Sequence, residues 1–225
     1  MKPIIKAVIP VRSGSLRVKN KNLKPFAGSS LLELKITQLL KTPGLDGVCV
    51  NSNDPEMLKV AEQLGVETCL REQMFATNEI PMSAVYANIA ENLVCDVVLF
   101  VHATNPLADE VTYSNAIRCY HGLDEQYDSV TTVSDVKDFL YWNGKALNYD
   151  PANKPRSQDL PDIVKLNHVA SVLPRKTIIE RSDILGHAPY FLKLDDMEST
   201  DIDTDLDFQI AEYLYQTKQA MKSSP

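Results

Sequence analysis

A cluster of positive charge near the start of the chain is the first feature that could do chemistry. Residues 1–32 contain seven Lys or Arg and no Asp or Glu, although the chain as a whole has a formal net charge of −7. Gly14 lies between two serines, and a glycine there lets backbone N–H groups approach an anion closely. The side chains able to donate charge-assisted hydrogen bonds to a polyphosphate are Arg12, Arg17, Lys19 and Lys21.

We call residues 12–22 the basic turn. It contains neither G-x-x-x-x-G-K-[ST] nor the three glycines of a dinucleotide fingerprint. The basic turn therefore predicts a polyphosphate site of another kind, and a solvated basic loop is the alternative.

Acidic residues cluster near the other end of the chain. Residues 195–207 hold seven acids and no base, and we call residues 199–207 the acid turn. Asp201 and Asp203 are two positions apart, so in an extended segment both carboxylates leave the same face and can grip a hard cation such as Mg²⁺. An EF-hand is excluded because Leu206 stands where that loop needs glycine. The alternative is that Thr204 or Asp205 caps the helix that follows and that acids favour its positive end, which accounts for Asp205 and Asp207 but not for the first pair.

A basic turn and an acid turn in one chain together indicate a metal-bound nucleoside triphosphate. The expected chemistry is displacement at phosphorus, in which the protein contributes mainly orientation and stabilisation of charge.

The overall composition narrows the class of protein. The net charge of −7 and a pI near 5.1 argue against a nucleic-acid partner. The four cysteines show no C-x-x-C spacing and are expected to be reduced core thiols. No apolar stretch is long enough for a signal peptide or a bilayer span, so we expect a cytoplasmic protein without membrane contact.

Short apolar runs alternate with helix-length segments, a pattern typical of an α/β fold with a largely parallel sheet. Ligands of such sheets bind beyond the carboxyl ends of the strands, so the loops after Val11, Asn51, Leu70 and Val101 should line the site. The expected strands are 4–11, 47–51, 67–70, 97–101, 129–133 and 190–194, and the expected helices are 30–40, 55–64, 82–93, 110–122 and 206–221. In the last helix we expect one buried face, made of Leu206, Ile210, Ala211, Leu214 and Tyr215.

Residues 135–173 break this alternation, with Asn143-Gly144 as a hairpin signal and three prolines. We expect a lobe here that could pair with a second subunit, inserted into a nucleotidyltransferase domain formed by residues 1–134 and 174–225. The sheet should be rejoined near Tyr190.

The motifs together resemble the acylneuraminate cytidylyltransferases (CMP-sialic acid synthetases) along nearly the whole chain. Ile9 to Asn22 is similar to the family's I-[PL]-A-R-x-x-S-K-x-x-x-x-K-N, with Leu16 in place of the usual lysine. Arg71 matches the arginine of the family's L-R-P, and residues 101–106 match L-Q-x-T-S-P, with His102 replacing the glutamine. Residues 153–159 are similar to R-P-R-x-Q-D, and Asn167 matches an asparagine that follows this motif. Residues 199–207 are similar to S-I-D-I-D-T-x-x-D.

The resemblance implies a Rossmann-like, mostly parallel sheet flanked by helices, and a homodimer formed through the proline-rich lobe. The reaction that it implies is the transfer of CMP from CTP to the anomeric hydroxyl of a nine-carbon 2-keto sugar acid. It also implies Mg²⁺ or another divalent cation as cofactor. The catalytic residues would be Arg12, Lys21 and Asp203, and the metal ligands Asp201 and Asp203. The nucleotide would be bound by Pro10, Val11, Arg12, Ser15, Arg17, Lys21, Asn22 and Arg71. The sugar acid would be bound by His102, Thr104, Arg156, Gln158, Lys165 and Asn167.

Some alternatives stay open. The acceptor could be 3-deoxy-octulosonate or its 8-amino analogue, although the Lys19-Asn-Lys21-Asn22 stretch favours the acylneuraminate type. The protein could also be a nucleotide-binding regulator without catalysis. His102 could be an ordinary structural residue and Lys165 an ordinary solvated cation. The remaining histidines show no paired spacing, and no metal role is predicted for them.

Overall fold

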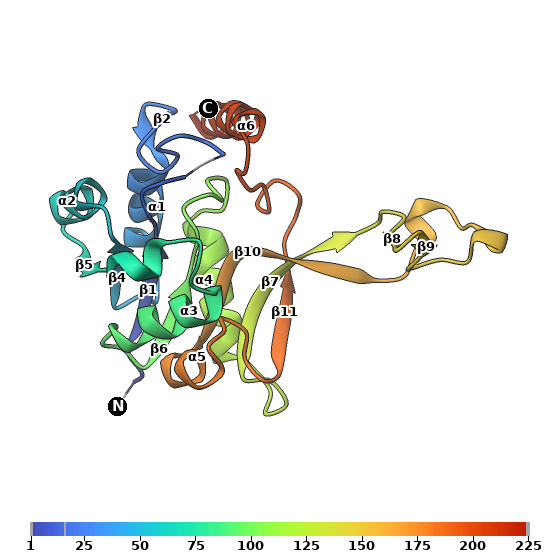
Figure 1. Ribbon diagram of the computed structural model, residues 1–225, viewed down its shortest axis with the longest axis horizontal. Helices are drawn as coiled ribbons and strands as arrows, with labels where there is room; N and C mark the ends of the chain where they lie inside the picture. Colours follow the sequence, from blue (N-terminus) through green and yellow to red (C-terminus); the bar gives the residue numbers. More distant parts are fainter. Residues whose placement is uncertain (1, 16, 224–225) are drawn as a thin grey trace.

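The computed structural model describes residues 2–15 and 17–223. Within this part of the chain, seven strands form one sheet in the order β11-β7-β10-β6-β1-β4-β5 (Figure 1). Neighbouring strands are parallel except where β10 pairs antiparallel with β6 and β7. The strands are β1 (Ile5–Pro10), β4 (Gly47–Ser52), β5 (Glu67–Leu70), β6 (Val97–Phe100), β7 (Ser129–Val136), β10 (Ile163–Pro174) and β11 (Pro189–Lys193). The predicted α/β class with a mostly parallel sheet is confirmed.

Helices cover both faces of this sheet (Figure 1). Side chains of β1 alternate between two apolar clusters, with Ile5, Ala7 and Ile9 on one face and Val8 on the other. The first cluster is completed by α1 (Leu31–Leu40), α2 (Pro55–Gln63), α4 (Glu110–His121) and α6 (Asp205–Ser223), and the second by α3 (Met82–Glu91) and α5 (Arg175–Arg181). No helix in the described ranges is both long and apolar enough to cross a membrane.

Local capping explains why the helices begin close to the predicted positions. The Ser30 hydroxyl accepts from the N–H of Glu33 at the start of α1. Asp54 caps α2, which has proline at its first position, and Asp109 forms a capping box at the start of α4. These side chains satisfy backbone N–H groups that the helices leave without internal partners.

Strands β7 and β10 continue beyond the sheet into a projecting arm, residues 137–162 (Figure 1). The prediction that the sheet is rejoined only near Tyr190 is wrong, because β10 already lies between β7 and β6. Much of residues 163–173 thus forms a central strand, and the arm is shorter than the predicted lobe. The strand escaped prediction because its pairing register shifts between Leu166 and Ser171, which interrupts the alternation of side chains.

The tip of the arm contains the predicted hairpin. Asn143 and Gly144 both have positive φ, 49° and 75°, as a two-residue type I′ turn requires. The turn joins β8 (Tyr141–Trp142) to β9 (Lys145–Ala146), and two short 3₁₀ turns follow it, η2 (Pro151–Asn153) and η3 (Ser157–Asp159). Tyr141 and Trp142 are 59% and 69% exposed in the single chain.

Helix α6 buries only part of the expected face. Ala211 is buried and Tyr215 packs against the core as expected, but Leu206 and Ile210 are exposed and Phe208 is buried instead. The reason is a small hairpin after the basic turn, β2 (Pro25–Phe26) and β3 (Ser29–Ser30), whose Phe26 ring meets the Phe208 ring edge-on at 5.4 Å. Helical periodicity alone could not show which of two adjacent rows of side chains on the helix packs against this hairpin.

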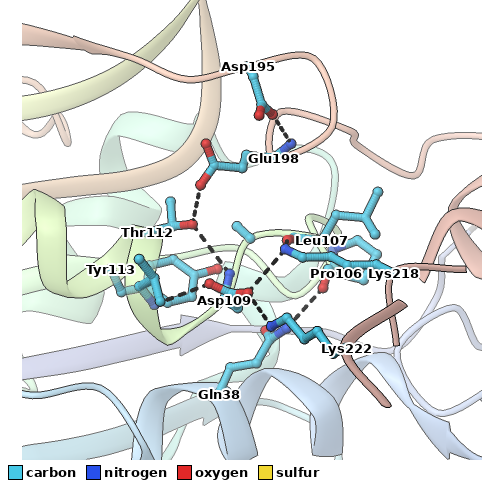
Figure 2. Close-up of polar contacts among 12 residues, drawn as sticks. Gln38, Pro106, Leu107, Asp109, Thr112, Tyr113, Asp195, Glu198, Lys218 and Lys222 are labelled. Atoms are coloured by element: carbon cyan, nitrogen blue, oxygen red, sulfur yellow. Dashed lines mark hydrogen bonds and ion pairs between the residues drawn. The ribbon is translucent and has the colours of Figure 1, made fainter. Parts of the chain in front are cut away.

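Asp109 fastens the C-terminal helix to the loop after β6. Its carboxylate accepts from Lys218 at 3.0 Å and from Lys222 at 3.1 Å (Figure 2). Thr112 of the same capping box bonds to Glu198, which lies just before the acid turn (Figure 2). Burial acts to raise the pKa of Asp109, but the hydrogen bonds from the two lysines outweigh it and lower the pKa. Helix α6 is therefore fixed against the loop that follows β6.

Candidate active site

Two adjoining cavities lie beyond the carboxyl ends of β1, β5 and β6. The polar cavity, about 470 Å³, is lined by the basic turn and by His102, Ala103 and Thr104. The apolar cavity, about 310 Å³, lies against Phe75, Tyr86 and Phe100. The two cavities share five residues: Pro10, Val11, Arg12, Asn78 and His102. The loops after Val11, Leu70 and Val101 line these cavities as predicted, but the loop after Asn51 contributes no lining residue, so the prediction is wrong for that loop.

The basic turn presents its polar side chains to the polar cavity. Ser15, Arg17, Lys21 and Asn22 all line it. The turn is anchored by Val18, which is fully buried. Asn20 adopts a left-handed conformation, and its carbonyl accepts from the N–H groups of Leu23 and Lys24. The replacement at Leu16 lies outside the described residues.

Arg12 stands where the two cavities meet. Its guanidinium donates to the carbonyl of Ala76 at 2.5 Å and to Oδ1 of Asn78 at 2.6 Å. Both acceptors are neutral, so neither compensates the positive charge of the guanidinium, and an anionic ligand can still pair with it. Asn78 was not predicted as a site residue, and no motif around it marks it.

Arg71 is buried at the base of the apolar cavity. Its Nε donates to Oδ1 of Asn51 at 2.6 Å and its Nη2 to the carbonyl of Asn51 at 3.1 Å. Burial, with the nearby charge of Arg12, lowers the pKa of Arg71 to about 10. Among the described residues neither arginine forms an ion pair with a carboxylate. Two guanidiniums near one another without a carboxylate partner suit an anionic ligand.

The acid turn is held against the basic turn. The N–H of Ile202 donates to the carbonyl of Thr104 at 3.0 Å, and Lys21 Nζ donates to the carbonyl of Ile202 at 2.6 Å. The Ile202 side chain is fully buried, while Asp201 is exposed and Asp203 half-buried. Because the flanking side chains point away from Ile202, both carboxylates face outward, as their spacing predicted.

Charges of opposite sign meet where these turns touch. Arg17 and Asp203 form an ion pair of 2.8 Å. Burial lowers the pKa of Lys21, while Asp201 and Asp203 oppose that shift by stabilising its charge.

The other two acids of the turn have structural roles. Thr204 and Asp207 form reciprocal hydrogen bonds at the start of α6, with the Thr204 N–H donating to Asp207 at 2.8 Å and the Asp207 N–H to the Thr204 hydroxyl at 3.2 Å. Hydrogen bonds from Thr204 lower the pKa of Asp207. Asp205 pairs with Lys24 at 3.0 Å. The predicted capping role of Thr204 and Asp207 is confirmed.

The carboxylates of Asp201 and Asp203 fit a magnesium ion only if the substrate supplies further ligands. Within residues 2–15 and 17–223 no group of three or more His, Cys, Asp or Glu could hold a metal. Two carboxylates are nevertheless a suitable donor set for Mg²⁺, which keeps several waters and commonly binds substrate phosphates as well. The cations of the basic turn lie beside this pair, where such phosphates would be held.

His102 lines both cavities from the end of β6. Its ring lies edge-on to Phe100 at 5.7 Å and 5.6 Å from the ring of His168. Burial is the main cause that lowers the pKa of His102 to about 4, and the charges of Lys21 and Lys35 add to it. The imidazole is therefore neutral near pH 7.

Four predicted sugar-site residues do not line the two cavities of the single chain. Arg156 and Gln158 lie exposed on the arm, where Arg156 pairs with Asp159 at 2.7 Å. Lys165 is an exposed residue of β10, opposite Ser134 in the register. Asn167 is buried, and its amide group bonds to protein groups on β7 and in the acid turn.

Comparison with known proteins places this geometry in a family. A family model described as cytidylyltransferase matches residues 6–223. The CMP-N,N'-diacetyllegionaminic acid synthase of Legionella pneumophila is 27% identical over 229 residues, covering 96% of this chain and 97% of that protein. The pseudaminic acid cytidylyltransferase of Campylobacter jejuni is 27% identical over 223 residues, covering 92% and 94%.

A solved structure agrees on the fold. CMP:2-keto-3-deoxy-manno-octonic acid synthetase in complex with CTP superimposes with a TM-score of 0.70 at 14% identity, covering 96% of this chain and 99% of that one. The family match extends over the basic turn, both cavities and the acid turn. The chain therefore belongs to the cytidylyltransferase family.

Proposed function

We propose that this protein transfers CMP from CTP to the anomeric hydroxyl group of a nine-carbon 2-keto sugar acid and releases pyrophosphate. The observation that carries the proposal is the meeting of the basic turn and the acid turn at the polar cavity, through Lys21 with Ile202 and Arg17 with Asp203. Cations that would bind the triphosphate thus lie beside carboxylates that would bind its metal ion.

In the reaction, the hydroxyl oxygen of the acceptor forms a bond to the α-phosphorus of CTP. The bond from that phosphorus to the oxygen bridging to the β-phosphate breaks, pyrophosphate leaves, and the hydroxyl proton is released. Arg12 and Lys21 would stabilise the charge that develops on the phosphate oxygens, and Ser15 and Arg17 would orient the triphosphate.

Asp201 and Asp203 would hold a magnesium ion. The bound ion would supply positive charge to the triphosphate and fix its orientation. Arg17 would then exchange its ion pair with Asp203 for a contact with a phosphate oxygen, which gives this arginine one partner before CTP binds and another afterwards.

The nucleoside would lie between Pro10, Val11, Asn22 and the buried Arg71. The Val11 N–H already donates to the carbonyl of Asn51 at 3.0 Å. The Val11 carbonyl is then the group that would accept from the exocyclic amino group of cytosine. Arg71 would donate to ring or ribose oxygens, because its charge has no carboxylate partner among the described residues.

The acceptor is proposed from the relatives. Those reported above are named for legionaminic and pseudaminic acids, and another, from Oncorhynchus mykiss, is an N-acylneuraminate cytidylyltransferase. The octulosonate alternative has its own support in the structural match to the octonic acid synthetase. Pyrophosphate release from CTP and Mg²⁺ should therefore be measured with N-acetylneuraminate, N,N'-diacetyllegionaminate, pseudaminate and 3-deoxy-octulosonate.

At least one nine-carbon acid should be turned over with a kcat/KM at least tenfold above that of the eight-carbon acid. The reverse order would establish the octulosonate function. Silence with all four acids would refute the proposed activity.

We further propose that two chains associate through their arms. The arm exposes Tyr141 and Trp142, and it carries Arg156 and Gln158 away from the cavities of its own chain. Pairing of two arms would cover the aromatic residues and bring the polar ones toward the partner's sugar acid.

The described cysteines, Cys49, Cys69, Cys95 and Cys119, are all free. We propose a cytoplasmic location, where thiols stay reduced and CTP is available.

A further inference from the structure

His168 has a backbone conformation that side chains seldom adopt. Its φ is +56°, in the left-handed region, although it lies within β10. Such a conformation persists where the surrounding structure enforces it, and it is common at ligand-binding positions. His168 occupies the stretch where β10 has extra residues relative to β7, between Leu166 and Ser171. Bulges of this kind redirect side chains beside active sites.

Asn167 holds the bulge in place. Its Oδ1 accepts from the Thr132 hydroxyl at 2.6 Å and from the Val169 N–H at 3.3 Å. Its Nδ2 donates to the hydroxyls of Ser134 and Ser199, each at 3.0 Å. The amide thus ties the bulge both to β7 and to the acid turn. Because Asn167 is buried and makes all four bonds, the direction of the next residue is fixed.

The bulge brings the ring of His168 to that of His102. The ring centroids are 5.6 Å apart, and the planes are tilted by 48°. His102 lines both cavities and is backed by Phe100, so the two imidazoles form the polar end of a short aromatic row. His168 is itself exposed, which leaves its ring nitrogens accessible from solvent.

Two lysines add positive charge near His102, namely Lys21, which lines the polar cavity, and the buried Lys35. His102 lines both cavities, and His168, which lines neither, is exposed beside it, so imidazole N–H groups and the Lys21 cation together suit an anion here. The triphosphate would have its own cations in Arg12 and Arg17 of the basic turn. The second anionic group in the proposed reaction is the carboxylate of the acceptor, which is attached to the carbon that bears the attacking hydroxyl.

We infer that His168 and His102 form a two-imidazole subsite that binds the carboxylate of the acceptor sugar acid. This inference rests on the proposed function and adds a binding residue, His168, to it. The imidazole N–H groups would donate to the carboxylate oxygens and hold the anomeric carbon near Lys21.

The test uses His168→Gly, because glycine adopts positive φ without strain and keeps the bulge. Ser182→Gly is the matched control, since Ser182 has a φ of 53° at the end of α5 and does not line either cavity. In pyrophosphate-release assays, His168→Gly should raise the KM for the sugar acid by about tenfold or more and change the KM for CTP by less than about twofold.

The midpoint of thermal unfolding should not fall in His168→Gly, and Ser182→Gly should leave both KM values unchanged. An unchanged KM for the sugar acid in His168→Gly would overturn the inference. Equal increases in both KM values would also overturn it, because they would indicate general damage to the site.

A second measurement does not depend on turnover. The chain contains four histidines, so the imidazole resonances can be assigned in an NMR titration with N-acetylneuraminate and with its methyl ester. The His102 and His168 resonances should shift with the acid and much less with the ester, while those of His121 and His187 stay fixed. Equal shifts with acid and ester, or no shift at saturation, would overturn the subsite even if the enzyme is active. Absence of pyrophosphate release with every acid would instead refute the proposed function. The NMR titration would then still show whether the two imidazoles bind a carboxylate.

Discussion

The ammonium group of Lys21 donates a 2.6 Å hydrogen bond to the carbonyl of Ile202, a residue 181 positions later in the chain. This bond holds a cation of the basic turn against the acid turn, between whose two carboxylates Ile202 stands in the sequence. Burial lowers the pKa of Lys21, but the neighbouring aspartates oppose the shift. The lysine is therefore positioned before any ligand binds, which is what stabilisation of a transition state requires.

Removing this cation should slow the chemical step. Lys21→Ala is expected to lower kcat/KM by on the order of 10²-fold, with most of the loss in kcat, because the lost interaction strengthens as charge develops on phosphate oxygens. Steady-state pyrophosphate release measures it. Lys19→Ala is the control, since Lys19 is exposed in the same turn and does not line the polar cavity. A change confined to the KM for CTP would show that Lys21 only binds substrate.

Removing one metal ligand should change the dependence on magnesium. Asp203→Ala is expected to lower turnover by at least about 10²-fold and to abolish its saturation with Mg²⁺, while the far-ultraviolet circular dichroism stays unchanged. Asp205→Ala is the matched control, because Asp205 lies in the same turn but pairs with Lys24. If both variants respond to magnesium as the wild type does, the proposed ligand pair is wrong.

The ion pairs of Asp109 predict a pH dependence of stability. The pKa of Asp109 is lowered in the folded protein, so its contribution is present above the unfolded value of about 3.9 and is lost as the pH falls through the lower folded value. Asp109→Asn should reduce the free energy of unfolding by about 2 kcal/mol at pH 7, through weakened hydrogen bonds to Lys218 and Lys222. Urea denaturation at pH 7 and below pH 4 measures both quantities.

The difference between Asp109→Asn and wild type should shrink at the acidic end of that range. Asp124→Asn, on an exposed turn, should show no comparable difference at either pH. A constant difference across the range would mean that the charge of Asp109 does not stabilise the fold.

The proposed dimer can be tested at the tip of the arm. Trp142 is 69% exposed in the single chain, and Trp142→Glu should convert a dimer into a monomer in sedimentation equilibrium by placing a charge in the apolar interface. Val94→Glu is the control, because Val94 is 81% exposed on the body of the protein. Activity toward the sugar acid should fall in the first variant only. A wild-type chain that is already monomeric would contradict the proposal.

The sequence predicted the regular part of the fold because apolar periodicity and helix caps act locally. The strand 67–70 and the starts of the helices at Pro55, Met82 and Glu110 agree with the structure. Strand β10 was missed because its bulge depends on Asn167, whose partners lie on another strand and in the acid turn. Such partners are visible only once the chain has folded.

The site was predicted to a similar extent. The basic turn and the pair of aspartates could be found because unusual charge segregation has few structural causes. Asn78, which holds Arg12, and Asn51, which orients Arg71, could not be found in this way, because single polar residues near apolar runs are common. The places of Arg156 and Gln158 relative to a sugar acid depend on a second chain, which a single sequence does not describe.

The first and last parts of the chain also meet in the contacts between Phe26 and Phe208 and between Lys24 and Asp205. During synthesis, the basic turn leaves the ribosome long before the acid turn exists. A nascent chain that stops before Thr200 has the cations for a triphosphate but lacks both proposed metal ligands. The site would therefore be complete only after the acid turn has been synthesised, and a chain that stops before Thr200 would be inactive and would leave an uncovered apolar face at Phe26.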